Sequence, residues 1–375
     1  MVWSFSLKKF HLKKSKKQQT YSMKCTIVSS IVFVVAAILY GASYAFVAKG
    51  LKYFSAGLFQ TFRMLFGFIF TVGLLLIRYI INKDGIYRQI VKAHFTSGVM
   101  PIVWMLIDGL LNLGTPHCLI AVAQKWVSSA DVQLMLPIST GAGAILAHFV
   151  LPDEPFTWWK LWSILASIAG VALCGVPSFR HAESTGASMK QMCLGYFLVF
   201  ISVVMFGVAP VFYKWKCPNS DVTTGVAIQL FASVVWNAIW MLCFDGPKNI
   251  TRMVFDAPPI AWLWPVMVGV LVSGVAVQCL LYLVTALGSF GTNLVPFGQL
   301  ITGVIVGVAF LHEWDIYKKW EIGICCVGIL FIILSLALGF IQPKAKNGEE
   351  EEKGETEHRD EEEEADDNGE QLAEL

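Results

Sequence analysis

Four side chains that can bind a polar solute occur along the apolar run 97–124, at spacings of four, four and three. They are Trp104, Asp108, Asn112 and Thr115. In an α-helix these spacings place all four on one face. A carboxyl group midway along an apolar run is costly in a membrane, and such groups usually face a protein interior or a watery path. The pattern predicts a cavity in which Asp108 binds a cationic group or takes a coupling proton. The alternative is a structural acid, protonated or bonded to a neighbouring helix.

Other polar residues inside apolar runs extend this predicted cavity. The additional candidates for contacting substrate are Gln278, Tyr282, Asn293 and Gln299. Amide and phenol groups can both donate and accept hydrogen bonds around a polar solute; the alternative is hydrogen bonding between helices. His117 is a candidate proton relay, or a satisfied interior histidine. Gln133 and His148 are weaker candidates, and Asp131 lies near a helix start, where a capping role suffices.

An internal repeat organises the chain. The stretch 130–176 recurs 159 positions later, so that Pro137 corresponds to Pro296 and Glu154 to Glu313. Two-fold sequence symmetry in a very apolar chain is typical of membrane carriers built from two related halves. Each proline removes a backbone donor, so we expect Pro137 and Pro296 to kink their helices and to be candidate hinges.

The two repeated glutamates follow the ends of their apolar runs. We expect Glu154 and Glu313 to lie in interfacial loops, where they cap a helix or pair with basic groups such as Lys160 and Lys319, six positions on. A gating role is the alternative.

The composition predicts an all-α integral membrane protein. The chain has 375 residues, of which 56% are hydrophobic and 15% charged, whereas soluble domains have about 25% charged residues. Ten runs are long enough to cross about 30 Å of hydrocarbon as helices. They are 26–48, 54–81, 97–124, 129–150, 158–177, 193–214, 223–244, 261–286, 290–311 and 320–341. A repeat unit with five crossings must be inverted in the membrane relative to its copy.

Charge predicts how the chain is divided and oriented. Residues 1–25 form a basic arm, residues 26–177 and 193–341 form the two repeats around the linker 178–192, and residues 342–375 form a disordered acidic tail, with 15 acidic and two basic residues in 349–375. The loops and arm on the side of both termini carry 16 Lys and Arg against nine on the other side. This bias predicts that both termini are cytoplasmic; plasma membrane and endomembranes remain alternatives.

The order of these features resembles the drug/metabolite transporter superfamily, and in particular its EamA-like ten-helix carriers. In that family the fourth helix of each half follows a small-residue turn, holds an early proline and is followed by an acid. The matching features here are Ser128-Ser129-Ala130 with Pro137 and Glu154, Gly288-Ser289-Phe290 with Pro296 and Glu313, and the fifth-helix glycines Gly170, Gly323 and Gly328. Where the family often has Trp-Gly in the first helix and Arg-Phe in the second, this chain has Tyr40-Gly41, with Phe206-Gly207 in the second half, and Arg63-Met64. The departures at Tyr40 and Met64 leave the subfamily and the substrate open. The resemblance covers about residues 26–341. It implies two inverted five-helix halves with a substrate cavity between them.

These observations favour a secondary-active transporter of a small polar metabolite, and not an enzyme. The sequence contains no GxxxxGK[ST] loop for a nucleotide-driven pump and no GxSxG or HExxH motif. The expected partners are the lipid bilayer and a small-molecule substrate, with proton coupling as an option and no nucleic acid, metal or cofactor. A nucleotide-sugar antiporter is the alternative within the superfamily, but it needs cations in the cavity, and the deep charge predicted here is Asp108. A non-transporting receptor or scaffold is the alternative outside it.

Overall fold

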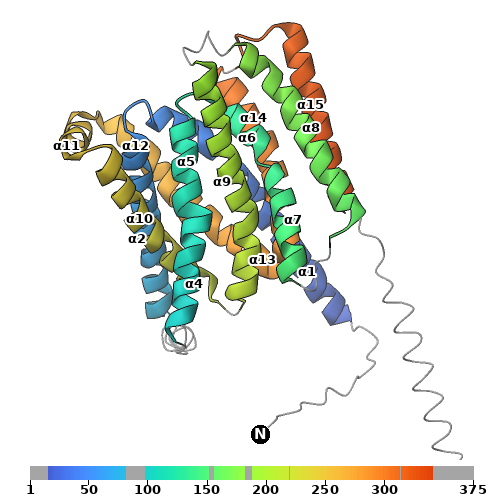
Figure 1. Ribbon diagram of the computed structural model, residues 1–375. Coiled ribbons are helices and arrows are strands. Elements are labelled where there is room, and N and C mark those ends of the chain that lie inside the picture. Colours follow the sequence, from blue (N-terminus) through green and yellow to red (C-terminus); the bar gives the residue numbers. More distant parts are fainter. Residues whose placement is uncertain are drawn as a thin grey trace, which may run out of the picture.

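The apolar runs of the sequence fold as helices. A computed structural model describes residues 16–81, 98–151, 156–181, 188–218, 220–312 and 314–340, and within these ranges it contains helices and no strand (Figure 1). The elements are α1 (Lys16–Gly50), α2 (Ala56–Ile81), α4 (Val99–Gly109), η1 (Leu110–Gly114), α5 (Thr115–Ala123), α6 (Ser129–Met135), α7 (Ile138–Val150), α8 (Trp158–Arg180), α9 (Met189–Lys216), α10 (Val222–Phe244), α11 (Pro247–Asp256), α12 (Pro259–Met267), η3 (Val268–Ala276), α13 (Val277–Thr292), α14 (Val295–Leu311) and α15 (Lys319–Phe340). The predicted all-α fold class is confirmed.

Eight helical segments of the described chain are long and apolar enough to cross a membrane. They are Ile27–Gly50, Ala56–Ile81, Val99–Ala123, Ser129–Val150, Trp158–Arg180, Met189–Lys216, Val222–Phe244 and Pro259–Gly288. The protein is therefore a multi-pass membrane protein. The two other predicted crossings correspond to α14, which is shorter at 17 residues, and to α15, which has 22 residues.

Three of the predicted crossings are interrupted helices. Residues 97–124 become α4, η1 and α5, and residues 261–286 become α12, η3 and the start of α13, where η1 and η3 are π-helical. A π-segment closes i→i+5 hydrogen bonds and so rotates the side chains that follow it relative to a regular α-helix. The crossing 129–150 divides into α6 and α7 at Pro137, which has no N–H to continue the ladder.

Two features of the second half differ from the sequence prediction. The helix expected over 290–311 begins only at Val295, after a break at Gly288, whose φ of 76° is left-handed. The short helix α11 was not predicted; it begins after Gly246 with a proline in its first turn and has no buried residue. Its position between α10 and α12 makes it a surface helix of the loop and not a crossing.

Side-chain caps fix the starts of four crossings. Ser128, Thr157 and Asp221 each accept a hydrogen bond from the backbone N–H three residues further on. Ser188 forms a reciprocal capping box with Gln191. These caps satisfy donors that a helix start leaves unpaired, so they place the ends of the crossings independently of the apolar pattern.

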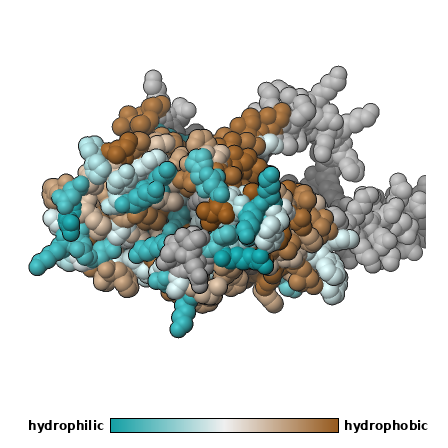
Figure 2. Space-filling model, turned by 90° about the horizontal axis from the view of Figure 1, so that it is seen from above, coloured by the Kyte–Doolittle hydropathy of each residue, from teal (hydrophilic) through white to brown (hydrophobic). Residues whose placement is uncertain are grey.

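The polarity of the bundle suits a lipid environment. Many large apolar side chains are exposed, among them Ile80, Phe149, Phe310 and Leu330, whereas polar and charged side chains lie inside. Viewed from one end, hydrophilic side chains gather on the end face and hydrophobic ones lie along parts of its margin (Figure 2). Polar groups inside and apolar groups outside are the arrangement expected where the surrounding solvent is hydrocarbon.

The helices of the two predicted repeats pack reciprocally. Helix α1 packs on α14, and its repeat counterpart α9 packs on α7; α2 packs on η3, and its counterpart α10 packs on α4 and η1; α8 and α15 pack on each other. Glycines lie where these helices contact one another. A Cβ on Gly41 would lie 2.8 Å from the backbone oxygen of Gln299 on α14, and a Cβ on Gly170 would lie 2.6 Å from the backbone oxygen of Gly328 on α15. Such reciprocity is expected for two halves related by a two-fold axis.

Candidate functional site

A small cavity lined by both polar and apolar side chains lies between helices of both halves. It has a volume of about 50 Å³, room for a few water molecules. The residues that line it are Tyr40, Tyr44, Asn112, His117, Leu136, Ser139, Phe206, Pro210, Leu280, Thr292, Asn293, Val295, Pro296 and Gln299. They come from α1, η1, α5, α7, α9, α13 and α14 and from the breaks before α7 and α14. The cavity thus lies where the interrupted helices of the two halves meet.

The structure brings together four of the residues predicted to contact substrate or protons. Asn112, His117, Asn293 and Gln299 all line the cavity, although they are separated by up to 187 positions in the chain. The predicted hinge Pro296 lines it as well. These residues offer amide and imidazole groups for hydrogen bonds, but among the lining residues there is no carboxylate and no lysine or arginine.

The acid that was predicted to lie in the cavity, Asp108, is not among the lining residues. Asp108 has no exposed surface and accepts a 2.8 Å hydrogen bond from Nε2 of Gln229 on α10. The sequence predicted one face for Asp108 and Asn112, but η1 begins between them and rotates Asn112 towards the cavity. The π-segment therefore separates two residues that a regular α-helix would align.

Four other residues predicted to contact substrate also lie outside the cavity lining. They are Trp104, Thr115, Gln278 and Tyr282. The Trp104 ring lies 5.1 Å from Nζ of Lys216 and forms an edge contact with Phe212. Gln278 donates to the Gly274 carbonyl oxygen at 3.1 Å. Thr115 and Tyr282 are half-buried. Within the described chain these side chains support helix packing, and their contact with substrate remains a hypothesis.

Two helix breaks marked by prolines lie next to the cavity. Pro137 precedes α7, and Pro296 lies in the first turn of α14, so each proline marks a helix start. Oγ1 of Thr140 donates to the backbone oxygen of Asn293 at 2.6 Å and joins the two breaks directly. Backbone groups freed from the α-helical ladder need such partners inside a membrane protein. The hinge role predicted for both prolines stays a prediction.

The orientation of His117 follows from one hydrogen bond. Its Nδ1 lies 3.2 Å from the Leu113 carbonyl oxygen, which can only accept, so Nδ1 carries the proton. In the neutral ring Nε2 is then an acceptor. The ring packs edge-on against Phe206, another lining residue, at 5.0 Å. His117 can therefore accept a hydrogen bond from a group in the cavity.

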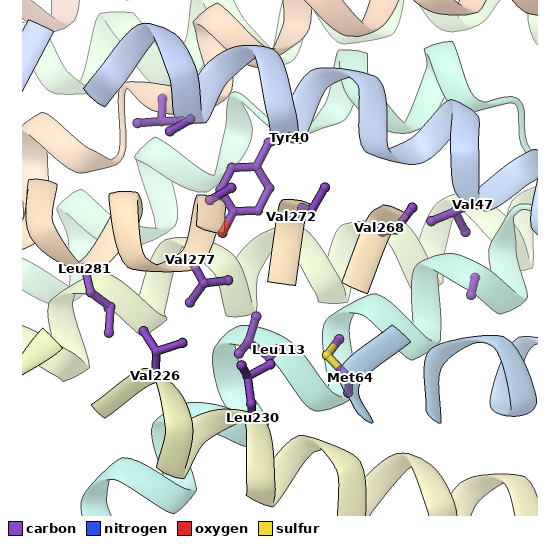
Figure 3. Packing of buried hydrophobic residues seen from close by; sticks show 14 of the residues in the cluster. Tyr40, Val47, Met64, Leu113, Val226, Leu230, Val268, Val272, Val277 and Leu281 are labelled. Atoms are coloured by element: carbon purple, nitrogen blue, oxygen red, sulfur yellow. The ribbon is translucent and has the colours of Figure 1, made fainter. Parts of the chain in front are cut away.

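Several lining residues were not predicted from the sequence. Tyr40 and Tyr44 are four residues apart on α1, which is the spacing that could have identified them as one polar face of an apolar helix. Ser139 and Thr292 are small hydroxyl residues of the kind that also stabilise helix contacts, so their types alone carry no signal. Figure 3 shows Tyr40 extending from α1 towards the helix that carries Val272 and Val277.

Some predictions concern residues outside the described part of the chain. Glu154 and Glu313, the acidic tail 342–375 and most of the basic arm 1–25 lie there. Among the described residues, no group of three or more His, Cys, Asp and Glu side chains is placed to hold a metal ion.

Comparison with known protein families finds a similarity in the first half of the chain. Residues 28–176 match the model of the EamA-like transporter family. The match lies within the predicted first repeat and confirms the resemblance to drug/metabolite transporters. The match supports a membrane transporter of the drug/metabolite type, whose expected partners are the lipid bilayer and a small-molecule substrate.

The fold has relatives among solved structures. One chain, described only as a crystal structure of a protein, is 15% identical and superposes with a TM-score of 0.53 over 84% of this chain and 99% of its own length. At this identity the likeness concerns the fold alone. A comparison with curated proteins gave no match.

Asp108 offers a direct test of its role. We expect Asp108→Asn to keep substrate exchange and any uptake driven by a pH gradient, because an amide oxygen can still accept the Gln229 hydrogen bond. Asp108→Ala leaves the buried Gln229 amide without its acceptor and should destabilise the protein by about 1–3 kcal/mol. Transport assays and thermal unfolding of both variants separate these effects. Loss of pH-driven uptake in Asp108→Asn, with stability unchanged, would instead support the proton-coupling role.

Proposed function

We propose that this protein is a secondary-active carrier that moves a small polar metabolite by alternating access through the central cavity. The observation that supports this most is a cavity to which both halves of a reciprocally packed bundle contribute polar side chains. In such folds transport occurs when one half rocks against the other around a central site. The proposal includes no catalytic step and no cofactor.

The chemistry of the lining suits a polar solute. Asn112, Asn293 and Gln299 offer amide donors and acceptors, and Tyr40 and Tyr44 combine a hydroxyl with an aromatic face. A hydrocarbon-like solute would leave these groups without partners. The lining therefore favours a substrate with several hydrogen-bonding groups.

The size of the cavity indicates a closed conformation. Binding pockets for metabolites measure about 300–1,000 Å³, whereas this cavity measures about 50 Å³. A metabolite can bind only when helices of the two halves move apart. A carrier must pass through such a closed state between its two open states, whereas a receptor has no need of one.

Counterflow in proteoliposomes tests this proposal. Purified protein is reconstituted with a panel of amino acids, organic acids, nucleosides, organic cations and nucleotide sugars, and exchange of labelled substrate is measured. We expect exchange of at least one small polar metabolite, and we expect Asn112→Leu to reduce it at least tenfold. The matched control is Asn249→Ala, an exposed asparagine on α11 that bonds only the Asp245 carbonyl oxygen.

The outcomes separate the alternatives. Preferential exchange of nucleotide sugars would support the antiporter alternative. Absence of exchange for every compound, from protein with a normal unfolding transition, would contradict the carrier proposal and support a receptor or scaffold. Equal activity of Asn112→Leu and Asn249→Ala would place the substrate outside this cavity.

A further inference from the structure

A buried arginine lies beside the cavity without an acidic partner. Arg63 on α2 is 1% exposed and is the largest fully buried side chain of the described residues. Its Nε donates to Oγ of Ser273 on η3 at 3.0 Å, and its Nη1 donates to Oε1 of Gln60 at 3.3 Å. Within the described chain Nη2 has no hydrogen-bond partner, although it is buried. Two N–H donors of a cation therefore remain free inside the protein.

The guanidinium group lies close to the residues that line the cavity. Tyr40, Tyr44 and His117 are all lining residues, and all three are within electrostatic range of Arg63. Tyr40 extends towards the same interrupted helix whose η3 segment holds Ser273 (Figure 3). Asp108 on α4, a buried acid, hydrogen-bonds to Gln229 on α10. The cavity surroundings thus carry one positive charge that no described acid balances.

The second half shows that helix packing does not require this charge. Gln229 on α10 lies 166 positions after Arg63, the offset that also relates Gly207 to Gly41. Its Nε2 bridges from α10 to Asp108 on α4, as Arg63 bridges from α2 to Ser273 on η3. A neutral amide is therefore sufficient as the donor at this position of the fold. Arg63 forms the same kind of hydrogen-bonded bridge between helices and adds a positive charge that this hydrogen bond does not require.

An unbalanced buried cation is unfavourable unless an anion joins it. Removing a charge from water costs several kcal/mol unless it is paired, and the guanidinium group is the side chain best suited to carboxylate and phosphate oxygens. The two free N–H groups of Nη2 match a single oxyanion. A diphosphate has two phosphoryl groups, whereas the single pair of free N–H groups on Nη2 can bind only one of them.

We propose that the cavity accepts a small metabolite bearing one oxyanion, a carboxylate or a phosphate monoester, which Arg63 binds while the amides of the lining bind the rest of the molecule. This inference rests on the carrier function proposed above and specifies its substrate class. It reverses the charge preference predicted from Asp108, because Arg63 and not Asp108 lies beside the cavity.

Matched substrates test the inference. Counterflow is measured with carboxylates, with the amides of the same skeletons, with phosphate monoesters and with nucleotide sugars, using wild type, Arg63→Gln, Arg63→Lys and the control Arg78→Gln. Arg78 lies on the same helix and donates to Oγ1 of Thr223. We expect wild type to exchange an anion, Arg63→Gln to reduce that exchange at least tenfold, Arg63→Lys to retain part of it, and Arg78→Gln to retain most of it.

Each outcome supports or contradicts a specific statement. Preference for carboxylates or for phosphate monoesters supports the inference and identifies the oxyanion. Exchange of neutral amides or cations in preference to anions, unaffected by Arg63→Gln, overturns the inference but leaves the carrier proposal standing. Absence of exchange for every compound contradicts the carrier proposal itself, and the melting experiment then decides whether the charge of Arg63 is structural.

Thermal unfolding distinguishes a binding role from a structural one without a known substrate. If the charge is held for an anion, Arg63→Gln should raise the melting temperature of the ligand-free protein, because it removes an unbalanced buried charge and keeps a donor for Ser273. The variant should also lose the stabilisation that an exchanged anion gives to wild type. A lower melting temperature for Arg63→Gln than for Arg78→Gln would show a structural role and overturn the inference.

Discussion

Replacing Gly207 with valine is expected to abolish the folded transporter. A Cβ at this position would lie 2.1 Å from the backbone oxygen of Ser139 and 2.9 Å from the backbone nitrogen of Gly143. Both atoms belong to the backbone of α7, so no side-chain rotation relieves the clash. Overpacking a core typically costs about 1–3 kcal/mol, and a clash with a helix backbone should cost at least the upper end of this range. Helices α9 and α7 would have to separate where they line the cavity.

The measurement is the yield of monodisperse protein and its unfolding transition, followed by counterflow. Gly73→Ala is the matched control, because a Cβ on Gly73 of α2 meets no atom within 4 Å. Alanine is favoured over glycine in a helix by about 1 kcal/mol, so this control should be at least as stable as wild type. A Gly207→Val variant with wild-type stability would contradict the close packing of α9 on α7.

Glycine positions illustrate what the sequence alone can predict. The pairs Tyr40-Gly41 and Phe206-Gly207 occupy corresponding places in the repeat, and apolar runs located the helices. What each glycine contacts is a property of the assembled bundle. Gly41 meets α14 and Gly207 meets α7, and hydropathy does not encode which helix lies opposite.

The candidate site was predictable only in part, for two physical reasons. The π-segments η1 and η3 change the helical period locally, so Asp108 and Asn112 diverge although their spacing is α-helical. Arg63 was not predicted as a site residue, but α2 begins at Ala56 and buries Arg63 two turns further on against η3. Both effects depend on contacts between helices that are distant in sequence. Asn293 and Gln299, on either side of Pro296, were found because they are polar residues within an apolar run.

Replacing Asp131 with alanine is expected to be the most destabilising change among the buried polar residues at one end of the bundle. Oδ1 of Asp131 accepts from Oγ of Ser178 at 2.8 Å, and Oδ2 accepts from Oγ of Ser128 at 2.9 Å. The single hydroxyl proton of Ser178 is used by Asp131, so the 2.7 Å contact between Ser178 and Tyr317 has Tyr317 as donor. The network joins α6 and α8 of the first half to the segment before α15, which is more than the capping role the sequence predicted.

Alanine at position 131 would leave two hydroxyl donors without an acceptor. Hydrogen bonds to a charged acceptor contribute about 1.5–3 kcal/mol each, so the expected loss of stability is about 3 kcal/mol. Asp131→Asn keeps an acceptor oxygen and should lose less, and Tyr317→Phe removes only the bond between the halves and should lose about 1 kcal/mol. Thermal and denaturant unfolding of the three variants gives the series.

The stabilities of the three variants distinguish a hydrogen-bond network between helices from a simple helix cap by Asp131. The control Asp256→Ala removes an exposed acid, 70% accessible, that pairs with Arg252 on α11; surface pairs of this kind contribute about 0–1 kcal/mol. If Asp131 only caps α6, Tyr317→Phe should match this control and Asp131→Ala should lose about 1 kcal/mol. If the network holds the halves together at this end, Tyr317→Phe must fall between the control and Asp131→Ala, because it breaks one of the bonds that Asp131 organises.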